Sequence, residues 1–248
     1  MPEYGRIDQQ RMPFIDPPDV SGFPPPPWKL PGAEVLQVTI EVDTEAALDY
    51  LPEQLTRPVP AYAKLIIARY PDSPMGSFMQ AALMVACRHR ARWLQCVATA
   101  VVDQPQLAAA SAAIWSYPRQ VGTITLERTG NQVRGTIVER SQPILEIELP
   151  NVYAVDPAMI RYDITVTLRA HRGKAPEVLI VSAPPDPKEG WLAKGAQVIS
   201  HDIPPDSPWS RLGNRNTISS TYALVNLEWP APRAIDFSAA VGVASGLP

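Results

Sequence analysis

The sequence is poor in the residue types that build metal sites and disulfide frameworks. Its 248 residues include 2 cysteines, Cys87 and Cys96, and 3 histidines, His89, His171 and His201. Neither Cys-x-x-Cys nor His-x-x-x-His spacing occurs, so we expect no metal site and no other cofactor. The sequence shows no sign of export, and we therefore expect both cysteines to be reduced and buried in the core.

Long apolar runs and nucleotide-binding loops are missing as well. No apolar segment reaches the roughly 18 residues of a membrane span, and the start MPEYGRIDQQRMPF lacks the apolar stretch of a secretory signal. We expect a cytoplasmic protein that does not contact membranes. G-x-G-x-x-G, Walker A and G-x-S-x-G motifs are absent. The net charge of −3 and the lack of a basic stripe argue against a nucleic-acid partner, and we expect none.

Proline, by contrast, is abundant, with 29 residues that include the run at 24–27. Because proline donates no backbone hydrogen bond and prefers extended geometry, we expect residues 1–32 to form an extended arm. This arm would lie on the domain or on a neighbouring subunit, and an SH3-type ligand is the alternative. Residues 33–237 form the expected domain, and residues 238–248, SAAVGVASGLP, read as a flexible tail.

Hydrophobic patterning predicts a strand-dominated α+β domain. Asp43 and Thr44 offer capping oxygens for an expected short helix in TEAALDYLPEQL that ends near Pro52, and an alanine-rich stretch favours another at 106–114. Gly130 and Asn131 supply a hairpin turn. We therefore expect a large antiparallel sheet or cone-shaped barrel with a few short helices. The expected strands are 35–42, 61–68, 77–87, 93–102, 123–128, 132–140, 145–149, 162–168, 177–182 and 222–228.

Three segments resemble the acetoacetate decarboxylase family at that family's spacing, without a gap. AEVLQVTIEVDTEAALDYLPEQL resembles its strand–helix–LP start, RYPDSPMGSFMQ its D-x-x-G-x-G-x-Y-x-E loop, and IWSYPRQVG its Tyr-Pro-Lys-Lys-Leu-Gly signature. VLIVSAPPDP and ALVNLEWPAPRAIDF resemble its last strands. The resemblance covers most of the chain after the proline arm, and it implies that family's fold and a homo-oligomer.

The resemblance also implies a chemistry that this sequence no longer supports. In the family, a lysine amine attacks a ketone, and the resulting protonated imine accepts electrons as carbon dioxide leaves. Here the Tyr-Pro pair is kept as Tyr117 and Pro118, but Arg119 follows it. A guanidinium stays protonated and is a poor nucleophile, so we expect no Schiff base at this position.

The other polar positions of the family's pocket have changed too. The second lysine of the signature corresponds to Gln120, and the glutamate after the loop corresponds to Gln80. The glutamate of the preceding strand corresponds to Leu65, and the arginine before the first strand corresponds to Ala33. None of these positions keeps the chemistry of its counterpart.

We do not expect another lysine to take over. Lys64 adjoins Leu65 on an expected strand, and neighbours on a strand face opposite sides. If Leu65 lines the pocket, Lys64 points away from it. The remaining lysines, in loop-like or proline-flanked contexts, are Lys29, Lys174, Lys188 and Lys194.

The altered pocket is therefore expected to hold a larger and more apolar ligand. Its candidate catalytic residues are Arg119, Gln80 and Tyr117, which would donate hydrogen bonds to a carbonyl. The candidate substrate-binding residues are Leu65, Ala33, Phe78, Met79, Gln120 and Trp115. A cleft with a few convergent polar groups is the usual form of a small-molecule site.

Several functions fit such a pocket. We expect an enzyme without a Schiff-base lysine, a cyclase or isomerase of an apolar, polyketide-like intermediate in secondary metabolism. Cycloaddition, aldol-type closure and dehydration all remain open. The alternative is a binding protein without catalysis, in which Arg119 pairs with a ligand carboxylate. In a third alternative, Arg119 turns out to a surface carboxylate such as Glu127 and side chains fill the cavity. Retained decarboxylase or lyase activity is the reading that the lost lysine argues against.

Overall fold

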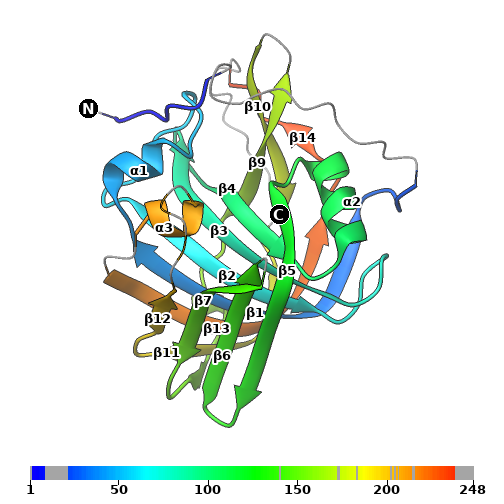
Figure 1. Ribbon diagram of the computed structural model, residues 1–248, viewed down its shortest axis with the longest axis vertical. Coiled ribbons are helices and arrows are strands. Elements are labelled where there is room, and N and C mark those ends of the chain that lie inside the picture. Colours follow the sequence, from blue (N-terminus) through cyan, green and yellow to red (C-terminus); the bar gives the residue numbers. More distant parts are fainter. Residues whose placement is uncertain are drawn as a thin grey trace.

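The computed structural model describes residues 2–8, 22–139, 141–171, 174–182, 184–201, 203, 205, 207–213 and 216–237. The tail expected at 238–248 and much of the proline-rich arm lie outside these residues. Strands dominate the described chain, as the sequence predicts, and the helices are short (Figure 1). No helix in this part of the chain is long and apolar enough to cross a membrane.

The strands form one 14-stranded sheet in the order β12-β7-β6-β5-β4-β3-β2-β1-β13-β11-β8, from which β9, β10 and β14 branch. The first seven strands are β1 (Trp28–Glu41), β2 (Tyr62–Tyr70), β3 (Phe78–His89), β4 (Arg92–Val102), β5 (Arg119–Thr129), β6 (Gln132–Glu139) and β7 (Gln142–Leu149). The others are β8 (Tyr153–Val155), β9 (Ile164–His171), β10 (Lys174–Ser182), β11 (Asp186–Ala193), β12 (Gln197–Ser200), β13 (Asn216–Trp229) and β14 (Arg233–Ala234). The helices are α1 (Thr44–Leu48), α2 (Pro105–Trp115), α3 (Pro208–Arg211) and the 3-10 helix η1 (Pro157–Met159).

The sheet divides at β4. Residues 94–96 of this strand pair with β9 and residues 100–102 pair with β5, both in parallel. The register between β3 and β4 shifts at Leu83 and Met84, at the level where β4 changes partner. Parallel neighbours need a crossover connection, and α2 supplies it between β4 and β5. The strand-dominated α+β fold is confirmed, but the sheet is mixed and open rather than wholly antiparallel.

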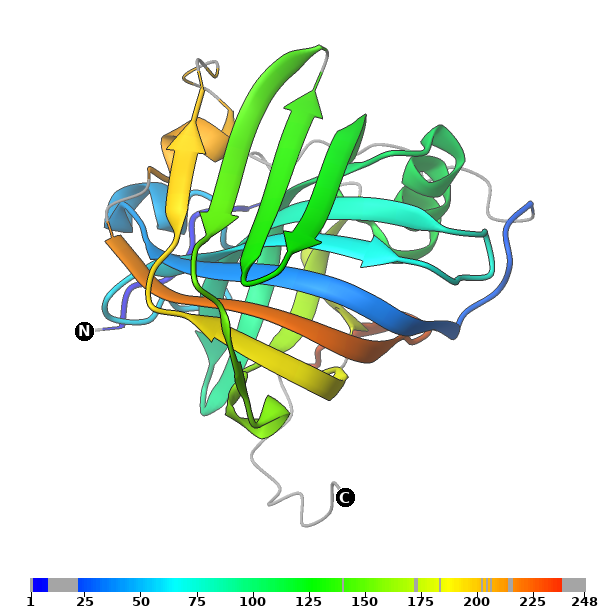
Figure 2. The ribbon, with the colours of Figure 1, turned by 90° about the horizontal axis from the view of Figure 1, so that it is seen from below.

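One face of the central strands is covered by the arm of β5, β6 and β7. Leu36, Leu65 and Leu83 share a hydrophobic core with residues of that arm. A Cβ added to Gly135 of β6 would lie 2.6 Å from Cδ1 of Ile67 on β2, so the two strands cross at close range. Figure 2 shows the three green strands of the arm running crosswise to β1, β2 and β13.

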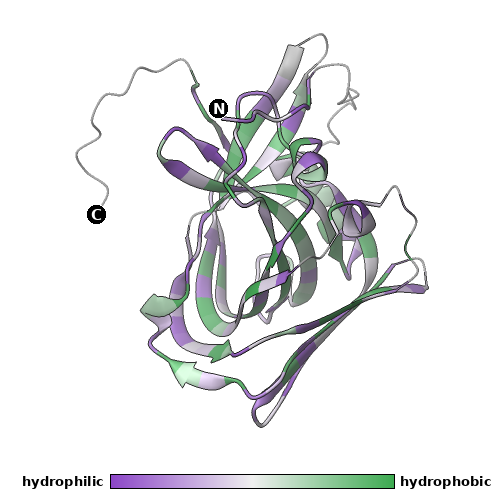
Figure 3. Ribbon diagram, turned by 90° about the vertical axis from the view of Figure 1, so that its left-hand side faces the viewer, coloured by the Kyte–Doolittle hydropathy of each residue, from purple (hydrophilic) through white to green (hydrophobic). Residues whose placement is uncertain are grey.

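The opposite face of the central strands meets α2 and β10. Val35, Ala82, Leu107 and Leu179 belong to a second hydrophobic core on this side. Figure 3 shows the sheet curving around the interior, with apolar segments in green on its strands. Both faces of β1, β2 and β3 are therefore buried, and the strand sequences carry long apolar runs for that reason.

Segments near the start of the chain are held on the domain by hydrogen bonds and by burial. Asp43 caps α1 as expected, since its Oδ1 accepts a hydrogen bond of 3.0 Å from the backbone N–H of Ala46. The backbone N–H of Gly5 donates to the carbonyl of Leu55 at 2.9 Å, so residues 2–8 lie on the domain. β1 begins at the fully buried Trp28, within the segment expected to be an arm.

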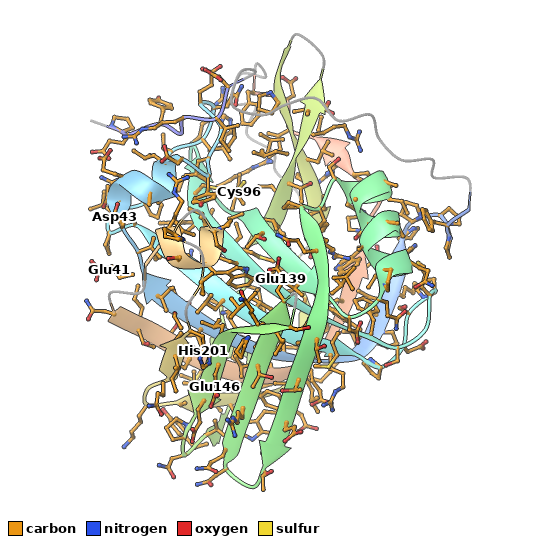
Figure 4. The ribbon with its side chains drawn as sticks, viewed as in Figure 1. Glu41, Asp43, Cys96, Glu139, Glu146 and His201 are labelled. Atoms are coloured by element: carbon orange, nitrogen blue, oxygen red, sulfur yellow. The ribbon has the colours of Figure 1, made fainter. Side chains whose placement is uncertain are left out.

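The sequence did not reveal β8, β11, β12 and β14. β11 reads DPKEGWLA, and its proline, glycine and charges hide a strand that pairs with β13 on one side and β8 on the other. The predicted burial of Cys87 and Cys96 is confirmed, and the structure shows both as free cysteines. Figure 4 shows Cys96 on β4 among the interior side chains.

Candidate active site

The turn between α2 and β5 places Arg119. α2 ends at Trp115, and Ser116 takes the left-handed conformation with φ of 56° that closes the helix. Tyr117 and Pro118 lead directly into β5, where Arg119 pairs with Ala100 of β4. The Tyr-Pro-Arg segment is thus fixed between a capped helix and a parallel strand pair, so its side chains have little freedom.

The guanidinium of Arg119 points into the protein. Its Nη2 donates a hydrogen bond of 2.6 Å to Oε1 of Gln80, and its Cζ lies 4.2 Å from the ring centre of Tyr117 and 4.9 Å from that of Trp229. Nε and Nη1 are buried without a hydrogen-bond partner in the described chain. These contacts contradict the alternative in which Arg119 turns out to Glu127, which is exposed.

Burial shifts the pKa values of this cluster without changing the protonation at neutral pH. Burial lowers the pKa of Arg119 to about 10, against the opposing effect of Tyr117 and Tyr70, so the guanidinium stays charged. Burial raises the pKa of Tyr117, which remains a neutral phenol able to donate its proton. Neither group supplies the neutral amine that an imine requires.

A cavity of about 60 Å³ lies beside this cluster, on the α2 and β10 side of the sheet. By the volume that a water molecule needs, it holds about four to six waters or a similarly small ligand. Its lining residues come from β1, β2, β3, β4, β10 and β13, from the segment around β9, from the turn between α2 and β5, and from the loop between β10 and β11. They are Val35, Gln37, Lys64, Ile66, Tyr70, Gln80, Met84, Gln95, Tyr117, Tyr162, Asp163, Thr165, Ser182, Pro185, Leu227 and Trp229.

The cavity includes two of the three expected catalytic residues. Gln80 and Tyr117 line it, and both are almost fully buried. Arg119 is not among the lining residues, and it contacts the cavity through Gln80, Tyr117 and Trp229. The structure therefore brings the three residues together, with Arg119 behind the other two.

None of the six expected substrate-binding residues lines the cavity. Phe78, Trp115 and Ala33 are buried in the core beside the cavity, where Trp115 donates a hydrogen bond of 2.7 Å to the carbonyl of Pro230. Met79 packs against the core on the opposite face of the sheet. Gln120 is exposed.

Leu65 and Lys64 lie on the opposite faces of β2 from those expected. Leu65 lies on the face of β2 that meets the β5–β7 arm, beside Leu83, while Lys64 lines the cavity. The strand pairing gives the reason. Gln80 lies opposite Ala68 and shares its face, and counting by twos from Ala68 leads to Ile66 and Lys64. The alternation was right, but the face assigned to each residue was wrong.

Lys64 meets Asp163 at the cavity wall, and the sequence analysis missed this pair. The Lys64 Nζ lies 3.1 Å from Oδ2 of Asp163, and 6% and 4% of the two side chains are exposed. Burial lowers the pKa of Lys64, although Asp163 opposes the shift. Burial pushes the pKa of Asp163 up, but Lys64, Gln95 and Arg161 outweigh it and hold this pKa below its usual value. The pair is therefore ionic.

A family model described as acetoacetate decarboxylase (ADC) matches residues 11–235. The chain belongs to the acetoacetate decarboxylase family, as its sequence segments suggest. No curated protein matches it.

Solved structures of this family share the fold at low sequence identity. Acetoacetate decarboxylase from Legionella pneumophila is 15% identical with a TM-score of 0.78, covering 92% of this chain and 94% of its own. The enduracididine biosynthesis enzyme MppR, complexed with pyruvate, is 17% identical with a TM-score of 0.73 and coverage of 88% and 93%. An acetoacetate decarboxylase-like enzyme from Sphingomonas wittichii RW1 is 18% identical with a TM-score of 0.67 and coverage of 85% and 92%.

Proposed function

We propose that this protein is an enzyme that binds a small carbonyl compound in the cavity beside Gln80 and Tyr117 and converts it without a Schiff base at residue 119. Among the reactions expected from the sequence, we favour an isomerisation or a dehydration. Each proceeds through an oxyanion that fixed hydrogen-bond donors stabilise. The enzymes among the similar structures, including one solved with pyruvate, support a catalytic role on small molecules.

The hydrogen bond from Arg119 to Gln80 carries this proposal. Because the guanidinium donates to Oε1 of Gln80, the amide is fixed with its Nε2 hydrogens as the remaining donors. Gln80 lines the cavity together with the neutral phenol of Tyr117. Two donors of fixed orientation, backed by a buried positive charge, suit a carbonyl oxygen whose negative charge grows during reaction.

The cavity narrows the substrate that the sequence suggested. A volume of about 60 Å³ is too small for a polyketide-like chain, and Gln80, Lys64 and Asp163 bring polar groups to its wall. We therefore propose a small polar carbonyl compound in place of an apolar intermediate, and we no longer favour a cyclase. Membership of a secondary-metabolism pathway stays a prediction from the sequence.

A binding protein without catalysis is the second candidate. The unpaired Nε and Nη1 of Arg119 favour it, because a ligand carboxylate would satisfy both buried donors. Such a ligand would have to displace Tyr117 or Trp229 to reach them, since the guanidinium lies against both rings. Tight binding of pyruvate with no chemical change in any carbonyl compound would favour this candidate.

Ligand-detected saturation-transfer NMR with pyruvate and acetone tests the proposed site. Gln80→Leu should abolish the saturation-transfer signal of both compounds. Gln120→Leu is the matched control, because Gln120 directly follows Arg119 in sequence but is exposed. This variant should keep the signal. Equal signals from the two variants would place the ligand elsewhere.

A further inference from the structure

The proposed function leaves a second group of cavity residues without a role. Lys64, Gln95 and Asp163 line the same cavity as Gln80 and Tyr117. They come from β2, from β4 and from the residue just before β9, at the place where the sheet divides. Lys64 lies four residues along β2 from Ala68, the partner of Gln80, so the two groups line different ends of the cavity. A carbonyl compound bound between them would contact both.

The carboxylate of Asp163 is held by three side chains. Its Oδ2 accepts a hydrogen bond of 3.1 Å from Nε2 of Gln95 and lies 3.1 Å from Nζ of Lys64. Its Oδ1 lies 3.4 Å from Nε of Arg161, whose side chain is 64% exposed. The contact at Oδ1 is longer than those at Oδ2, so Oδ1 is held less strongly than Oδ2. Oδ1 can therefore accept a proton without breaking a strong hydrogen bond.

Gln95 gives an independent sign that this wall faces a ligand. Its Oε1 is buried and has no hydrogen-bond partner among the described residues, while only 2% of the residue is exposed. A buried acceptor without a partner is costly in a folded protein and calls for an explanation. A ligand with a hydroxyl or another donor, bound in the cavity, would satisfy it.

We propose that Asp163 is the base that moves a proton within the bound carbonyl compound. This inference rests on the proposed function, because it needs the carbonyl oxygen to be held by Gln80 and Tyr117. Asp163 takes a proton from the carbon next to the carbonyl, and the electrons of that C–H bond form the enolate. The donors of Gln80 and Tyr117 stabilise the enolate oxygen. Asp163 then returns the proton to a different atom, so atoms and charges balance and the product is an isomer.

Lys64 acts on this step as a positioning residue. It holds the carboxylate of Asp163 in place, and its charge keeps the pKa of Asp163 low, so that the base is ionised over a wide pH range. It also donates a hydrogen bond of 3.3 Å to the carbonyl of Arg161, which ties the segment before β9 to β2. Replacing Lys64 with glutamine should therefore raise the pKa of Asp163 and change the pH dependence of activity. If Lys64 had only a structural role, the same replacement would lower activity equally at every pH.

Deuterium exchange into small carbonyl compounds tests the inference. The wild-type protein is incubated with pyruvate or acetone in D2O, and loss of the methyl proton signal is followed by ¹H NMR against a buffer blank. We expect the protein to accelerate exchange for at least one of the two. Asp163→Asn should reduce this acceleration by about 100-fold or more, the usual contribution of a general base. In Lys64→Gln, the acidic limb of the exchange rate should move to higher pH.

Two further variants guard against a folding defect. Lys64→Met/Asp163→Asn removes both buried charges and should fold while exchange stays lost. Asp186→Asn alters an exposed carboxylate that pairs with Lys188, and it should exchange at the wild-type rate. Thermal unfolding of each variant establishes that it is folded.

The outcomes separate this inference from the function on which it rests. Exchange that is lost in Asp163→Asn and in the double variant, with the saturation-transfer signal kept, supports it. Exchange at the wild-type rate in a folded Asp163→Asn overturns it and leaves the carbonyl site of Gln80 intact. An adduct at Lys64 after borohydride reduction overturns it as well, since that lysine would then be a nucleophile. A wild-type protein that accelerates neither exchange also overturns it.

Discussion

Nη2 of Arg119 lies 2.6 Å from Oε1 of Gln80 and donates a charge-assisted hydrogen bond to it inside the protein. By the resemblance described above, the two positions correspond to a lysine and a glutamate of the acetoacetate decarboxylase family. Arg119 keeps a positive charge at its position but is a poor nucleophile, and Gln80 is neutral. Gln80 lines the cavity and Arg119 lies behind it, so the cation works through the amide.

Arg119→Lys should give the protein an amine that it lacks. A lysine at this position would lie among Tyr117, Trp229 and Gln80, where burial disfavours the charged form and lowers the pKa of the amine. We expect reduction with borohydride in the presence of pyruvate to add one adduct to this variant, located at residue 119 by peptide mass spectrometry. Arg119→Gln is the matched control and should give no adduct at that residue.

Arg119→Met should remove function at little cost in stability. The guanidinium is buried with two unpaired nitrogens, and a buried charge with incomplete hydrogen bonding is unfavourable. We expect the free energy of unfolding to stay within about 1 kcal/mol of the wild-type value, or to rise, because an apolar side chain of similar volume replaces a poorly satisfied ion. Urea unfolding measures this. A loss above about 3 kcal/mol would show that the cation–π contacts outweigh burial of the charge.

Asp163→Asn should destabilise the fold more than the paired change does. Leaving Lys64 charged and without its carboxylate costs about 3–5 kcal/mol in a buried site. We expect Lys64→Met/Asp163→Asn to recover at least half of that loss, since it removes both charges. Chemical denaturation of the two single variants and the double variant gives the coupling energy. Strict additivity of the two single effects would contradict the ion pair.

Stability should fall on acidification through the titration of Asp163. Its folded-state pKa lies below the unfolded value of 3.8, so its contribution is present above about pH 4 and is lost as pH falls through the folded-state value. Lys64 has a lowered pKa and stays charged at acid pH, so protonated Asp163 leaves it without a counter-charge. The melting temperature of Lys64→Met/Asp163→Asn should depend less on pH below 4 than that of the wild type. Parallel curves for the two proteins would argue against this assignment.

Gly135→Ala should loosen the arm of β5, β6 and β7. Its new Cβ would lie 2.6 Å from Cδ1 of Ile67, and crowding of this kind in a packed core costs about 1–3 kcal/mol. Ile67→Val in the same chain should recover part of the loss by shortening the opposing side chain. Gly195→Ala is the control, because no atom lies within 4 Å of an added Cβ there. Equal melting temperatures for Gly135→Ala and Gly195→Ala would contradict the close crossing.

The sequence predicted those parts of the site that lie in short sequence motifs. The Tyr-Pro-Arg segment, with Gln80 at its family spacing, correctly indicated that Gln80, Tyr117 and Arg119 lie together. Strand alternation also stated correctly that Lys64 and Leu65 face opposite sides. Which side meets the cavity could not be read, because both faces of β2 are buried and its burial pattern shows no clear alternation.

The ion pair of Lys64 and Asp163 depended on a contact that no local pattern reveals. Lys64 lies on β2 and Asp163 just before β9, far apart in sequence, and they meet because β9 joins the first part of β4 in parallel. That branch of the sheet also decides which residues close the cavity. One signal was available in the sequence: a lysine inside an otherwise apolar strand calls for a buried partner. The partner itself required the fold.

Reductive trapping of the wild-type protein tests most directly whether it has lost imine chemistry. The protein is mixed with pyruvate, reduced with borohydride and measured by intact mass spectrometry, with Arg119→Lys as the positive control. We predict an unchanged mass for the wild type and an added adduct for the variant. A wild-type mass increase that depends on pyruvate, mapped to Lys64 or to any other lysine, would contradict the account.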